Sequence, residues 1–406
     1  MKLISTTGQE WQRLCGRQLV RKRRVEERVR QIVDEVYQGG DEALLRYTRR
    51  FDRVRLSPKQ LRVTEAEISG AFQHMDPKFA LQLKSAIQNV QTFYGRTRFK
   101  PVRCQDGNGV VLGEKFDPIE RVGVYIPGGT ASLVSTVYMT VIPAKKAGVK
   151  RVVLATPPRK DGSVDPHILA VASLLDVDEI YKMGGAQAIA AMAFGTKSIP
   201  KVDKIVGPGN AYVAEAKRQV FGFVDIDTIA GPSEIAIIAN RYSNTQYVLA
   251  DLMGETEHAG GIGFLITTSK ALARLARKQI PGGYCLLVKN LDEAAEVANQ
   301  LAPEHLEIMV RSPQKLVKRI RSAGAIFLGQ YSPVTVGDYI AGPSHVLPTG
   351  GAARTFSGLG IDDFIRRTHI VSYTKKALEQ VREPLERLTA IEGLPRHFDA
   401  VKVRLT

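Results

Sequence analysis

The sequence predicts an α/β protein with two Rossmann-like, doubly wound domains, a helical N-terminal segment and a small C-terminal extension. From about residue 120 onward, short apolar segments typical of buried strands alternate with helical patterns, and such alternation builds parallel sheets covered by helices. The chain has 406 residues, of which 44% are hydrophobic and 24% are charged. This is ordinary globular composition, with enough length for two sizeable domains.

The first hundred residues predict mostly helices. Apolar residues recur at helical spacing over 25–36, and Gly39-Gly40 is expected to end that helix. Asp41 then has the position of an N-cap for a helix over 42–51. A further amphipathic pattern covers 81–93.

Two runs of strand and helix patterns follow along the chain. The first run has expected strands at 122–126, 151–156, 179–183, 202–206 and 225–229, with helices between them. The second run has expected strands at 234–239, 263–267, 284–288 and 325–329, and a helix over 292–301. We expect a helix carrying Glu255 and His258 in this second run, ending at Gly260-Gly261.

The last part of the chain shows less periodicity. Residues 330–363 are rich in Gly, Pro and Ser, and an irregular segment of that length inside a compact domain usually serves a function. The 36 residues that follow 370 predict one charged helix near 375–388 and a tail.

The net charge of +16 raises the question of a nucleic-acid or anionic partner. Part of the excess lies in Arg21-Lys-Arg-Arg24, but Glu26 and Glu27 follow at once, and aromatic residues for base stacking are sparse there. The pattern therefore favours a solvated helix face over a nucleic-acid site.

Cysteine usage and hydropathy indicate a cytoplasmic protein. Cys15, Cys104 and Cys285 are far apart in the sequence, so we expect neither a disulfide framework nor a cysteine zinc site, as in a reducing compartment. Residues 1–18 lack the pattern of a signal peptide. No apolar run approaches the roughly 20 residues that a membrane helix needs.

Glu255 and His258 are three residues apart in a segment with helical apolar spacing. Residues at that spacing share a helix face, and a carboxylate with an imidazole on one face is half of a metal site. The remaining ligands would have to come from elsewhere in the chain.

Four of the seven histidines lie near acidic residues. These are His258 with Glu255 and Glu257, His305 with Glu304, His345 with Asp338, and His397 with Glu392. A satisfied polar residue explains each pair alone, but four together, three of them in turns bounded by Gly or Pro, favour a shared site. We assign the other three histidines to surface or structural roles (His74, His167, His369).

Glycine-rich turns between strands and helices are the second group of candidates. They occur at Gly128-Gly129, Gly184-Gly185 and Gly207-Pro-Gly209. Such turns let a backbone approach a phosphate and direct helix N-termini at it. None has the GxGxxG spacing of a standard dinucleotide fingerprint, and any α/β domain needs glycine turns.

Together these motifs resemble the zinc- and NAD-dependent histidinol dehydrogenases, from about residue 20 to the C-terminus. The matching motifs are Val122-Gly-Val-Tyr-Ile-Pro-Gly-Gly-Thr130, Gly184-Gly-Ala-Gln-Ala-Ile189, Val206-Gly-Pro-Gly-Asn-Ala-Tyr212, Ala230-Gly-Pro-Ser-Glu234, Glu257-His258, Ala302-Pro-Glu-His-Leu-Glu307, Gly337-Asp-Tyr339, His345-Val-Leu-Pro-Thr349, and Glu392-Gly-Leu394 with His397. So many motifs in one order make the resemblance specific.

The resemblance implies a role for each matching position. The ligands of one Zn²⁺ per subunit would be Glu255, His258, Asp338 and His397. Glu304 and His305 would be the acid/base pair. The substrate would contact Ser233, Glu255, His258, His305, Asp338, Glu392 and His397. NAD⁺ would bind to Tyr125, Gln187 and Asn210.

The family is homodimeric, so the tail with Glu392 and His397 would complete the neighbouring subunit's site. We therefore expect 1–24 to be an N-terminal helical segment, 25–121 with 232–370 the larger domain on the zinc and substrate side, 122–231 the NAD-side domain, and 371–406 the tail that reaches the partner.

One implied ligand departs from the family pattern, because Glu255 stands where the family usually has glutamine. A carboxylate is a competent zinc ligand, and with Asp338 it would balance the charge of the ion and leave a weaker Lewis acid. We hypothesise tighter metal binding, with slower turnover or a preference shifted toward Mn²⁺. Ser344 in place of asparagine and Gly260-Gly261 in place of a more polar turn bear on substrate identity.

The implied reaction, the last step of histidine biosynthesis, takes L-histidinol through L-histidinal to L-histidine and reduces two NAD⁺. No motif contains a cysteine, which favours a hydrated aldehyde over a thiohemiacetal. Glu304 would activate the water and His305 would take the alcohol proton in each oxidation. Zinc would anchor the imidazole and amine of the substrate, a positioning role.

Two alternatives remain open at this point. A paralogue on this scaffold would oxidise another small alcohol, such as a sulfonated diol, although Glu392 and His397 favour an amino alcohol with an imidazole. A basic, non-catalytic protein associated with nucleic acid would explain the charge of +16, but not the clusters of acidic residues and histidines. We expect a small-molecule substrate, and neither a membrane nor a nucleic acid as partner.

Overall fold

The computed structural model describes the chain except residues 18–22, 74, 98, 129–132, 230 and 258–259. The chain forms two compact units. The first comprises Met1–Arg96 and Ile119–Phe364, and the second comprises Thr97–Pro118 and Ile365–Thr406.

A five-stranded parallel sheet forms one layer of the first unit, with the order β6-β5-β4-β7-β8. Its strands are β4 (Arg121–Tyr125), β5 (Arg151–Thr156), β6 (Glu179–Lys182), β7 (Lys204–Val206) and β8 (Asp225–Ile226). The sequence leads from β4 outward to β5 and β6, and then returns to the other side of β4 at β7. This is the doubly wound arrangement that the alternating pattern predicts.

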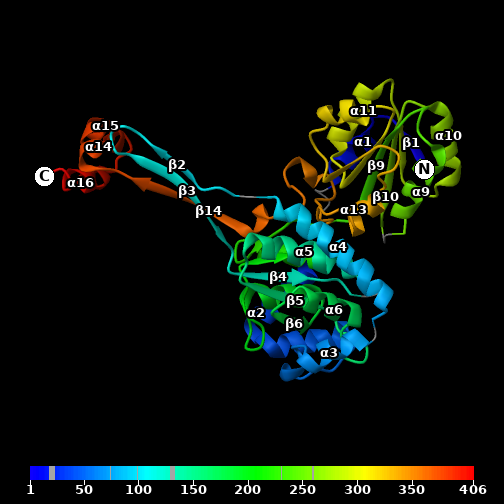
Figure 1. Cartoon of the computed structure of the whole chain (residues 1–406), viewed down its shortest axis with the longest axis horizontal. Helices are drawn as coiled ribbons and strands as arrows, with labels where there is room; N and C mark the ends of the chain where they lie inside the picture. Colours follow the sequence, from blue (N-terminus) through cyan, green and yellow to red (C-terminus); the bar gives the residue numbers. More distant parts are fainter. Residues whose placement is uncertain (18–22, 74, 98, 129–132, 230, 258–259) are drawn as a thin grey trace. The chain divides into compact units, whose positions relative to one another are not determined.

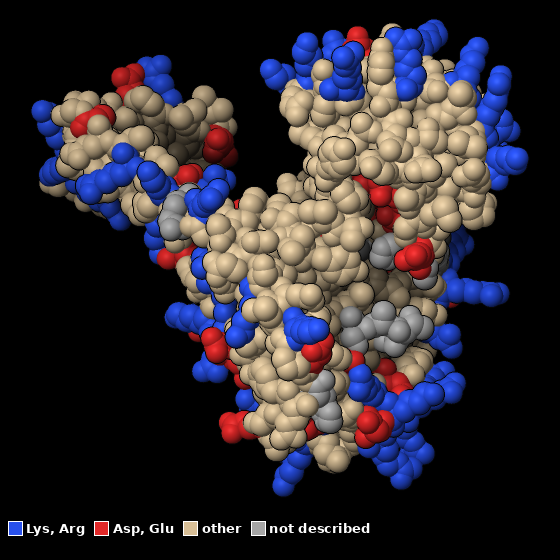
Figure 2. Space-filling view, turned by 45° about the vertical axis from the view of Figure 1, so that its right-hand side comes forward, with Lys and Arg blue, Asp and Glu red and all other residues tan. Residues whose placement is uncertain are grey.

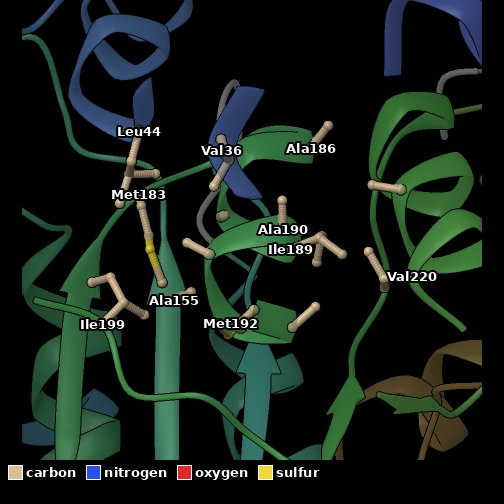
Figure 3. Packing of buried hydrophobic residues seen from close by; sticks show 14 of the residues in the cluster. Val36, Leu44, Ala155, Met183, Ala186, Ile189, Ala190, Met192, Ile199 and Val220 are labelled. Atoms are coloured by element: carbon tan, nitrogen blue, oxygen red, sulfur yellow. The ribbon is translucent and has the colours of Figure 1, made fainter. Parts of the chain in front are cut away.

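Four helices pack with this sheet, and Figure 1 labels two of them, α5 and α6, beside β4 and β5. They are α5 (Val134–Ala147), α6 (Pro166–Leu174), α7 (Gly185–Phe194) and α8 (Ala211–Val220). The helix α7 is almost wholly buried, since its Ala-rich sequence leaves no bulky polar face. Figure 3 shows Ile189 and Met192 of α7 packed near Val36 and other buried residues.

The helices of the first hundred residues pack on the same layer. They are α2 (Arg23–Phe51), α3 (Glu65–Gln73) and α4 (Pro77–Gly95). The helix α2 contacts α7 and α8, α3 contacts α6, and α4 contacts α5. Gly40 interrupts α2 with a φ of 52°, as expected for Gly39-Gly40. The Asp41 side chain accepts hydrogen bonds from Thr196 and Ser198 instead of capping the second part of α2.

A six-stranded parallel sheet forms the other layer of the first unit, with the order β1-β11-β10-β9-β12-β13. Its strands are β1 (Lys2–Ile4), β9 (Glu234–Ala239), β10 (Ile262–Thr267), β11 (Tyr284–Leu287), β12 (His305–Met309) and β13 (Ala325–Leu328). The sequence did not predict β12, because Glu304, His305 and Glu307 interrupt its apolar pattern. It did not predict β1 either, because three residues are too few to show an alternation.

Both faces of this sheet are buried, which explains the continuous apolar run of β9. The helices α1 (Gln9–Cys15), α11 (Leu291–Leu301) and α12 (Pro313–Leu316) pack with one set of alternating strand residues, which includes Ile238. The helices α9 (Thr245–Glu255) and α10 (Lys270–Gln279) pack with the other set, which includes Ile237. This second doubly wound layer agrees with the predicted fold class.

The end of α9 corrects one prediction. The helix ends at Glu255, not at Gly260-Gly261. Thr256 N–H donates to Met253 O and Glu257 N–H donates to Gly254 O, and these bonds over three residues close a tighter turn than an α-helix. His258 itself lies outside the described residues.

The segment 330–363 is largely irregular, as expected. It contains the short helix α13 (Val334–Tyr339). Hydrogen bonds fix this segment to the layer of the five-stranded sheet: Tyr138 donates to Tyr339 O, Asn89 to Ile340 O, and Tyr94 to Leu359 O.

The second unit is built on a three-stranded antiparallel sheet with the order β14-β3-β2. Its strands are β2 (Val102–Gln105), β3 (Val111–Pro118) and β14 (Ile365–Ser372), and its helices are α14 (Lys375–Gln380), α15 (Arg382–Ile391) and α16 (Pro395–Lys402). The single predicted helix near 375–388 is thus two helices, because Val381 separates them with non-helical angles. The sequence did not predict these strands, which are largely exposed and carry little apolar alternation.

Charged side chains of both signs lie on the surface of the molecule. Figure 2 shows Lys and Arg side chains projecting from several separate places on one face, with Asp and Glu among them. On α2, Arg46 pairs with Glu35. Arg21 and Lys22, half of the predicted basic run, lie outside the described residues. No helix in the described part of the chain is long and apolar enough to span a bilayer.

Candidate active site

Glu304 and His305 lie where the neighbouring strands β9 and β12 begin. The two strands are parallel and in register, with His305 beside Ile235, so their first residues meet at one edge of the sheet. Ser233 Oγ donates to Glu304 Oε2 at 3.0 Å, and Glu234 N–H donates to the same oxygen at 2.9 Å. The carboxyl group of Glu304 is therefore held firmly at the sheet edge.

The ring of His305 is buried and oriented by the backbone. Its Nδ1 lies 3.2 Å from Glu234 O, and a carbonyl oxygen can only accept, so Nδ1 carries the hydrogen. In the neutral ring, Nε2 then holds the lone pair. Nε2 lies 3.7 Å from Asp338 Oδ1, so the basic nitrogen points toward the side of the site that Asp338 borders.

Two further carboxylates meet at this ring. Glu255 Oε2 lies 4.0 Å and Glu304 Oε2 lies 3.9 Å from His305 Nδ1. Glu255 is the last residue of α9 and is buried, and Asp338 is half-buried in α13. The structure thus brings together five side chains from four separate segments of the sequence: Ser233, Glu255, Glu304, His305 and Asp338.

The donor set fits a divalent cation in its chemistry, since buried carboxylates together with an imidazole are ligands that zinc accepts. The part of the chain that the structure describes contains no group of three side chains positioned to hold an ion. Of the two other predicted ligands, His258 lies outside that part. His397 lies exposed in α16 of the second unit, and the exposed Glu392 directly follows α15 there.

Burial raises the pKa of the Glu304 carboxyl well above its ordinary value, and the negative charge of Glu255 raises it further. The hydrogen bonds from Glu234 N–H and Ser233 act in the opposite direction. A carboxyl group with a raised pKa is a stronger base when ionised and can release and take a proton closer to neutral pH. These properties suit a general base.

Behind Glu255 lies a second pair of carboxyl groups, Asp251 and Glu307. They hydrogen bond to each other, which requires one of them to hold a proton. Burial, followed by the charge of Asp251, raises the pKa of Glu307 to about 9, and burial also raises the pKa of Asp251. Glu307 Oε1 accepts from Val334 N–H at 2.9 Å, so this pair connects α9 with the first residue of α13.

His345 supports the other end of α13. Its Nδ1 donates to Asp338 O at 2.8 Å, and Thr136 Oγ1 lies 3.3 Å from its Nε2. Burial lowers the pKa of this imidazole, so the ring is held neutral. His345 therefore positions the backbone of Asp338, and the sequence had grouped the two residues without a role for His345.

The three residues predicted to bind NAD⁺ line one cavity of about 870 Å³ in the layer of the five-stranded sheet. Tyr125 ends β4, and its hydroxyl oxygen accepts from Gly185 N–H at 3.0 Å. Asn210 caps α8 by accepting from Tyr212 N–H and Val213 N–H. The side chain of Gln187 is buried, and among the described residues neither of its amide atoms has a hydrogen-bond partner.

A glycine is required in the turn between β7 and α8, next to the cavity residues Tyr125 and Asn210. A Cβ atom on Gly207 would lie 2.2 Å from Tyr125 O, and Gly207 has a φ of 116°. The buried ammonium of Lys217 donates to Gly207 O, while Gly207 N–H donates to Asp227 Oδ2 at 2.7 Å. An ion pair between Lys217 and Asp227 completes this locked turn. The buried amide of Gln187, with Gly128 and Gly185 in the cavity lining, fits a dinucleotide that approaches the backbone closely.

Two residues that the structure places in these sites, Asp52 and Glu307, are not among the residues predicted from the sequence. Asp52 lines the cavity from the end of α2, and nothing in its local sequence differs from a solvated helix end. Glu307 lies in the motif Ala302–Glu307, and its place two residues after His305 in that motif is the signal that could have identified it.

Comparison with known proteins supports one family. The family model described as histidinol dehydrogenase matches residues 16–405. The chain is 46% identical to histidinol dehydrogenase of Bacillus cereus, covering 94% of this chain and 92% of that protein. It is 45% identical to histidinol dehydrogenase of Listeria monocytogenes, covering 94% and 93% respectively.

A solved structure gives the same result for the fold. The crystal structure of histidinol dehydrogenase from Elizabethkingia anophelis matches with a TM-score of 0.92 and 34% sequence identity. The match covers 100% of this chain and 98% of that chain. The predicted resemblance and the predicted fold class are therefore confirmed.

Proposed function

Since the chain belongs to the histidinol dehydrogenase family, we propose that it oxidises L-histidinol through L-histidinal to L-histidine with two NAD⁺. The conversion of an alcohol to a carboxylate removes four electrons, which two hydride acceptors take up. The observation that carries this proposal is the meeting of Glu304, His305 and Ser233 with Glu255 and Asp338 at one sheet edge.

His305 is the base for both oxidations. Glu234 O holds the hydrogen on Nδ1, so Nε2 takes the hydroxyl proton as the carbon–hydrogen bond breaks. NAD⁺, when bound, accepts the hydride that leaves this carbon. The buried ring keeps the proton from exchanging freely with bulk water, and the nearby carboxylates stabilise the imidazolium that forms.

Glu304 serves the second oxidation. The aldehyde must first add water, and a carboxylate that Ser233 and Glu234 hold in place can remove a proton from that water. The resulting gem-diol is again an alcohol, and His305 acts on it as on the first. No cysteine belongs to the described site, which favours this route over a thiohemiacetal.

A zinc ion, when bound, would supply a fixed positive charge that anchors the imidazole and amino groups of the substrate. Glu255 and Asp338, with His258 and His397, would hold it. Ser233 and Glu392 would contact the substrate, and Glu255, His258, His305, Asp338 and His397 would lie close to it. The orphaned amide of Gln187, with Tyr125 and Asn210, supports the cavity as the NAD⁺ site.

We further propose a homodimer in which the tail containing Glu392 and His397 completes the neighbouring subunit's site. The exposure of both side chains on the second unit supports this proposal. Three free cysteines, Cys15, Cys104 and Cys285, support a reducing cytoplasmic compartment.

The decisive experiment measures NADH production from L-histidinol together with the metal content of the same sample. We expect two NADH per histidinol, and loss of activity with a chelator that added Zn²⁺ reverses. One NADH per substrate would limit the reaction to the aldehyde, and activity that survives complete metal removal would contradict the metal assignment.

The comparisons support histidinol dehydrogenase and neither of the two alternatives that the sequence left open. A sulfonated diol serves as a negative control in the same assay. Greater kcat/KM with the diol than with histidinol would contradict the proposed substrate.

A further inference from the structure

The cavity in the layer of the five-stranded sheet lies at the carboxyl ends of its strands. Tyr125 ends β4, Thr156 ends β5, and Gly185 follows β6; all three line the cavity. The order β6-β5-β4-β7-β8 makes β4 the first strand of the doubly wound arrangement and β5 the second. Ligands of such sheets bind at this edge, next to the point where the strand order reverses.

In dinucleotide-binding sheets, an acidic residue at the end of the second strand accepts hydrogen bonds from the adenosine ribose of NAD⁺. Here the second strand ends in Thr156-Pro-Pro-Arg-Lys160, which contains no acid. The first acid after it, Asp161, is exposed, accepts from Ser163, and does not line the cavity. The usual ribose-binding group is therefore missing from its usual place.

Asp52 brings a carboxylate to the same place from another element. It follows Phe51, the last residue of α2, and lines the cavity. A Cβ atom on Gly184 would lie 2.6 Å from Pro157 Cγ and 3.3 Å from Asp52 Oδ1. Asp52 Oδ1 thus lies against the turns that follow β5 and β6, where the ribose-binding acid of a dinucleotide fold would be.

The carboxyl group of Asp52 can accept further hydrogen bonds from a ligand. Its Oδ2 is buried, and no hydrogen-bond partner reaches it within the described residues. A buried polar atom without a partner costs free energy unless something else satisfies it. A ribose diol offers two hydroxyl donors to one carboxylate, which would meet this need.

We propose that Asp52 accepts hydrogen bonds from the adenosine ribose hydroxyls of NAD⁺ and thereby selects NAD⁺ over NADP⁺. The inference rests on the proposed NAD⁺-dependent function and deepens it by assigning a specificity-determining residue. Asp52 follows the helix α2 and not the second strand of the sheet. A different segment of this chain would therefore supply the acid that the second strand supplies in other dinucleotide-binding sheets.

The other charges around the cavity make Asp52 decisive for selectivity. Arg28 and Lys160 line the same cavity, and Arg159 does so while paired with Asp165. These cations would attract the 2′-phosphate of NADP⁺. The carboxylate of Asp52 would repel that phosphate, and it would also lose the hydrogen bond from the 2′-hydroxyl that the phosphate replaces. Removal of the Asp52 charge leaves the positive lining unopposed.

A thermodynamic cycle that removes the ribose 2′-hydroxyl from the ligand and the carboxylate of Asp52 from the protein tests the contact between them directly. Calorimetry measures the binding of ADP-ribose and of 2′-deoxy-ADP-ribose to the parent, Asp52→Asn and Asp52→Ala proteins. We expect loss of the 2′-hydroxyl to weaken binding to the parent by ~10-fold or more, as for a hydrogen bond to a charged group. For Asp52→Ala, the two ligands should bind almost equally.

The selectivity for NAD⁺ over NADP⁺ is measured as the ratio of kcat/KM with the two cofactors at saturating histidinol. Asp52→Asn should shift the ratio toward NADP⁺ by ~10-fold or more, since a like-charge repulsion disappears. Asp161→Asn is the matched control, because it removes the same charge from the neighbouring loop outside the cavity. It should leave both the cycle and the ratio unchanged.

Three results would overturn the proposal. The first is equal binding of the two ribose ligands to the parent, which needs no variant and so does not depend on how a variant folds. The second is the same loss in parent and Asp52→Ala, and the third is an unchanged cofactor ratio in Asp52→Asn. A parent that makes no NADH from histidinol would instead reject the proposed function on which this assignment rests.

Discussion

At the scale of single residues, the orientation of His305 is the central feature of the site. A backbone carbonyl fixes its tautomer, and three carboxylates surround its ring at 3.7 to 4.0 Å. The sequence predicted this residue, Glu304 and Asp338 through motifs. It could not predict their distances, because α9, α13 and the two strands meet only in the folded chain.

His305→Ala should lower kcat by about 10²- to 10⁴-fold, because it removes the base from both oxidations. The bound zinc should stay at the parent level, because His305 is not an assigned ligand. Glu304→Gln should slow oxidation of added histidinal more than the first oxidation of histidinol. Single-turnover measurements on each substrate separate the steps, and equal slowing of both would remove Glu304 from its assigned step.

Glu255→Gln should weaken metal binding, since it removes one negative charge next to a divalent cation. Competition with a chromophoric chelator measures the Kd for Zn²⁺ and Mn²⁺ in both proteins. We expect the parent to bind Zn²⁺ more tightly and to favour Mn²⁺ more than Glu255→Gln does. Identical affinities, metal preference and turnover in the two proteins would show that the carboxylate has no separate effect.

The pKa of Asp52 predicts a pH dependence of stability. Burial raises this pKa from 3.8 to about 6, so the folded state holds the proton more tightly than the unfolded state does. The free energy of unfolding should therefore fall as the pH rises from about 4 to about 6, and this contribution should be constant above that range. Asp52→Asn should flatten this part of the profile in thermal unfolding.

The binding of ADP-ribose should change in the opposite direction over the same range. The ionised carboxylate is the better acceptor for ribose hydroxyls, so affinity should rise as the pH increases through about 6. The charged groups that line the cavity with Asp52 are Arg28, Arg159, Lys160 and Asp165, and Tyr125, with a pKa of about 12, stays neutral. Affinity that falls with pH would contradict an acceptor role.

At the scale of elements, two short segments carry the carboxylates that the sequence assigned to the metal. Glu255 ends α9, and Asp338 lies in the six-residue α13. A helix this short has little stability of its own. Glu307 interacts with Asp251 of α9 and accepts from the first residue of α13, Val334. The buried His345 donates to the Asp338 carbonyl near the other end of α13. These contacts hold the two segments in place.

Glu307→Ala should loosen α13 and lower metal affinity, because Val334 N–H loses its acceptor and Asp251 loses its partner. Each lost buried hydrogen bond costs about 1–3 kcal/mol. Glu307→Gln keeps an acceptor for Val334 and should lose less. Thermal unfolding and zinc affinity measure the two effects, and parent values of both in Glu307→Ala would show that the contact is dispensable.

The elements also show where sequence patterns succeed and fail. The strands β4, β5, β9 and β10 are apolar runs flanked by turns, so their patterns predicted them. The strand β12 carries His305 and Glu307 into the core, and polar residues there hide its period. The buried strand β12 thus carries polar residues, instead of apolar ones, at the positions whose side chains lie in the candidate site.

At the scale of the whole molecule, the chain divides between a large unit with two parallel sheets and a small unit that includes the tail. Glu392 and His397 belong to the small unit. The proposed dimer gives these residues a place in the neighbouring site, in the manner of a symmetric assembly whose sites need both subunits.

Mixing two inactive proteins tests the shared site. His305→Ala lacks the base and His397→Ala lacks a ligand, so each homodimer should be nearly inactive. If the tail reaches the partner, a mixed dimer contains one site without either change, and random exchange should restore about a quarter of parent activity. If both groups serve the same subunit's site, no mixed dimer regains an intact site and activity stays low.

The sequence by itself determined the family, the two runs of parallel strands and the motifs that supply the site. These features reside in short segments, where local spacing and residue type carry the information. Only the tertiary structure decided that α9 ends at Glu255, that Glu307 contacts the first residue of α13, and that Asp52 lines the same cavity as Tyr125, Gln187 and Asn210. The physical reason is that these facts depend on packing between segments far apart in the chain, which no local pattern records.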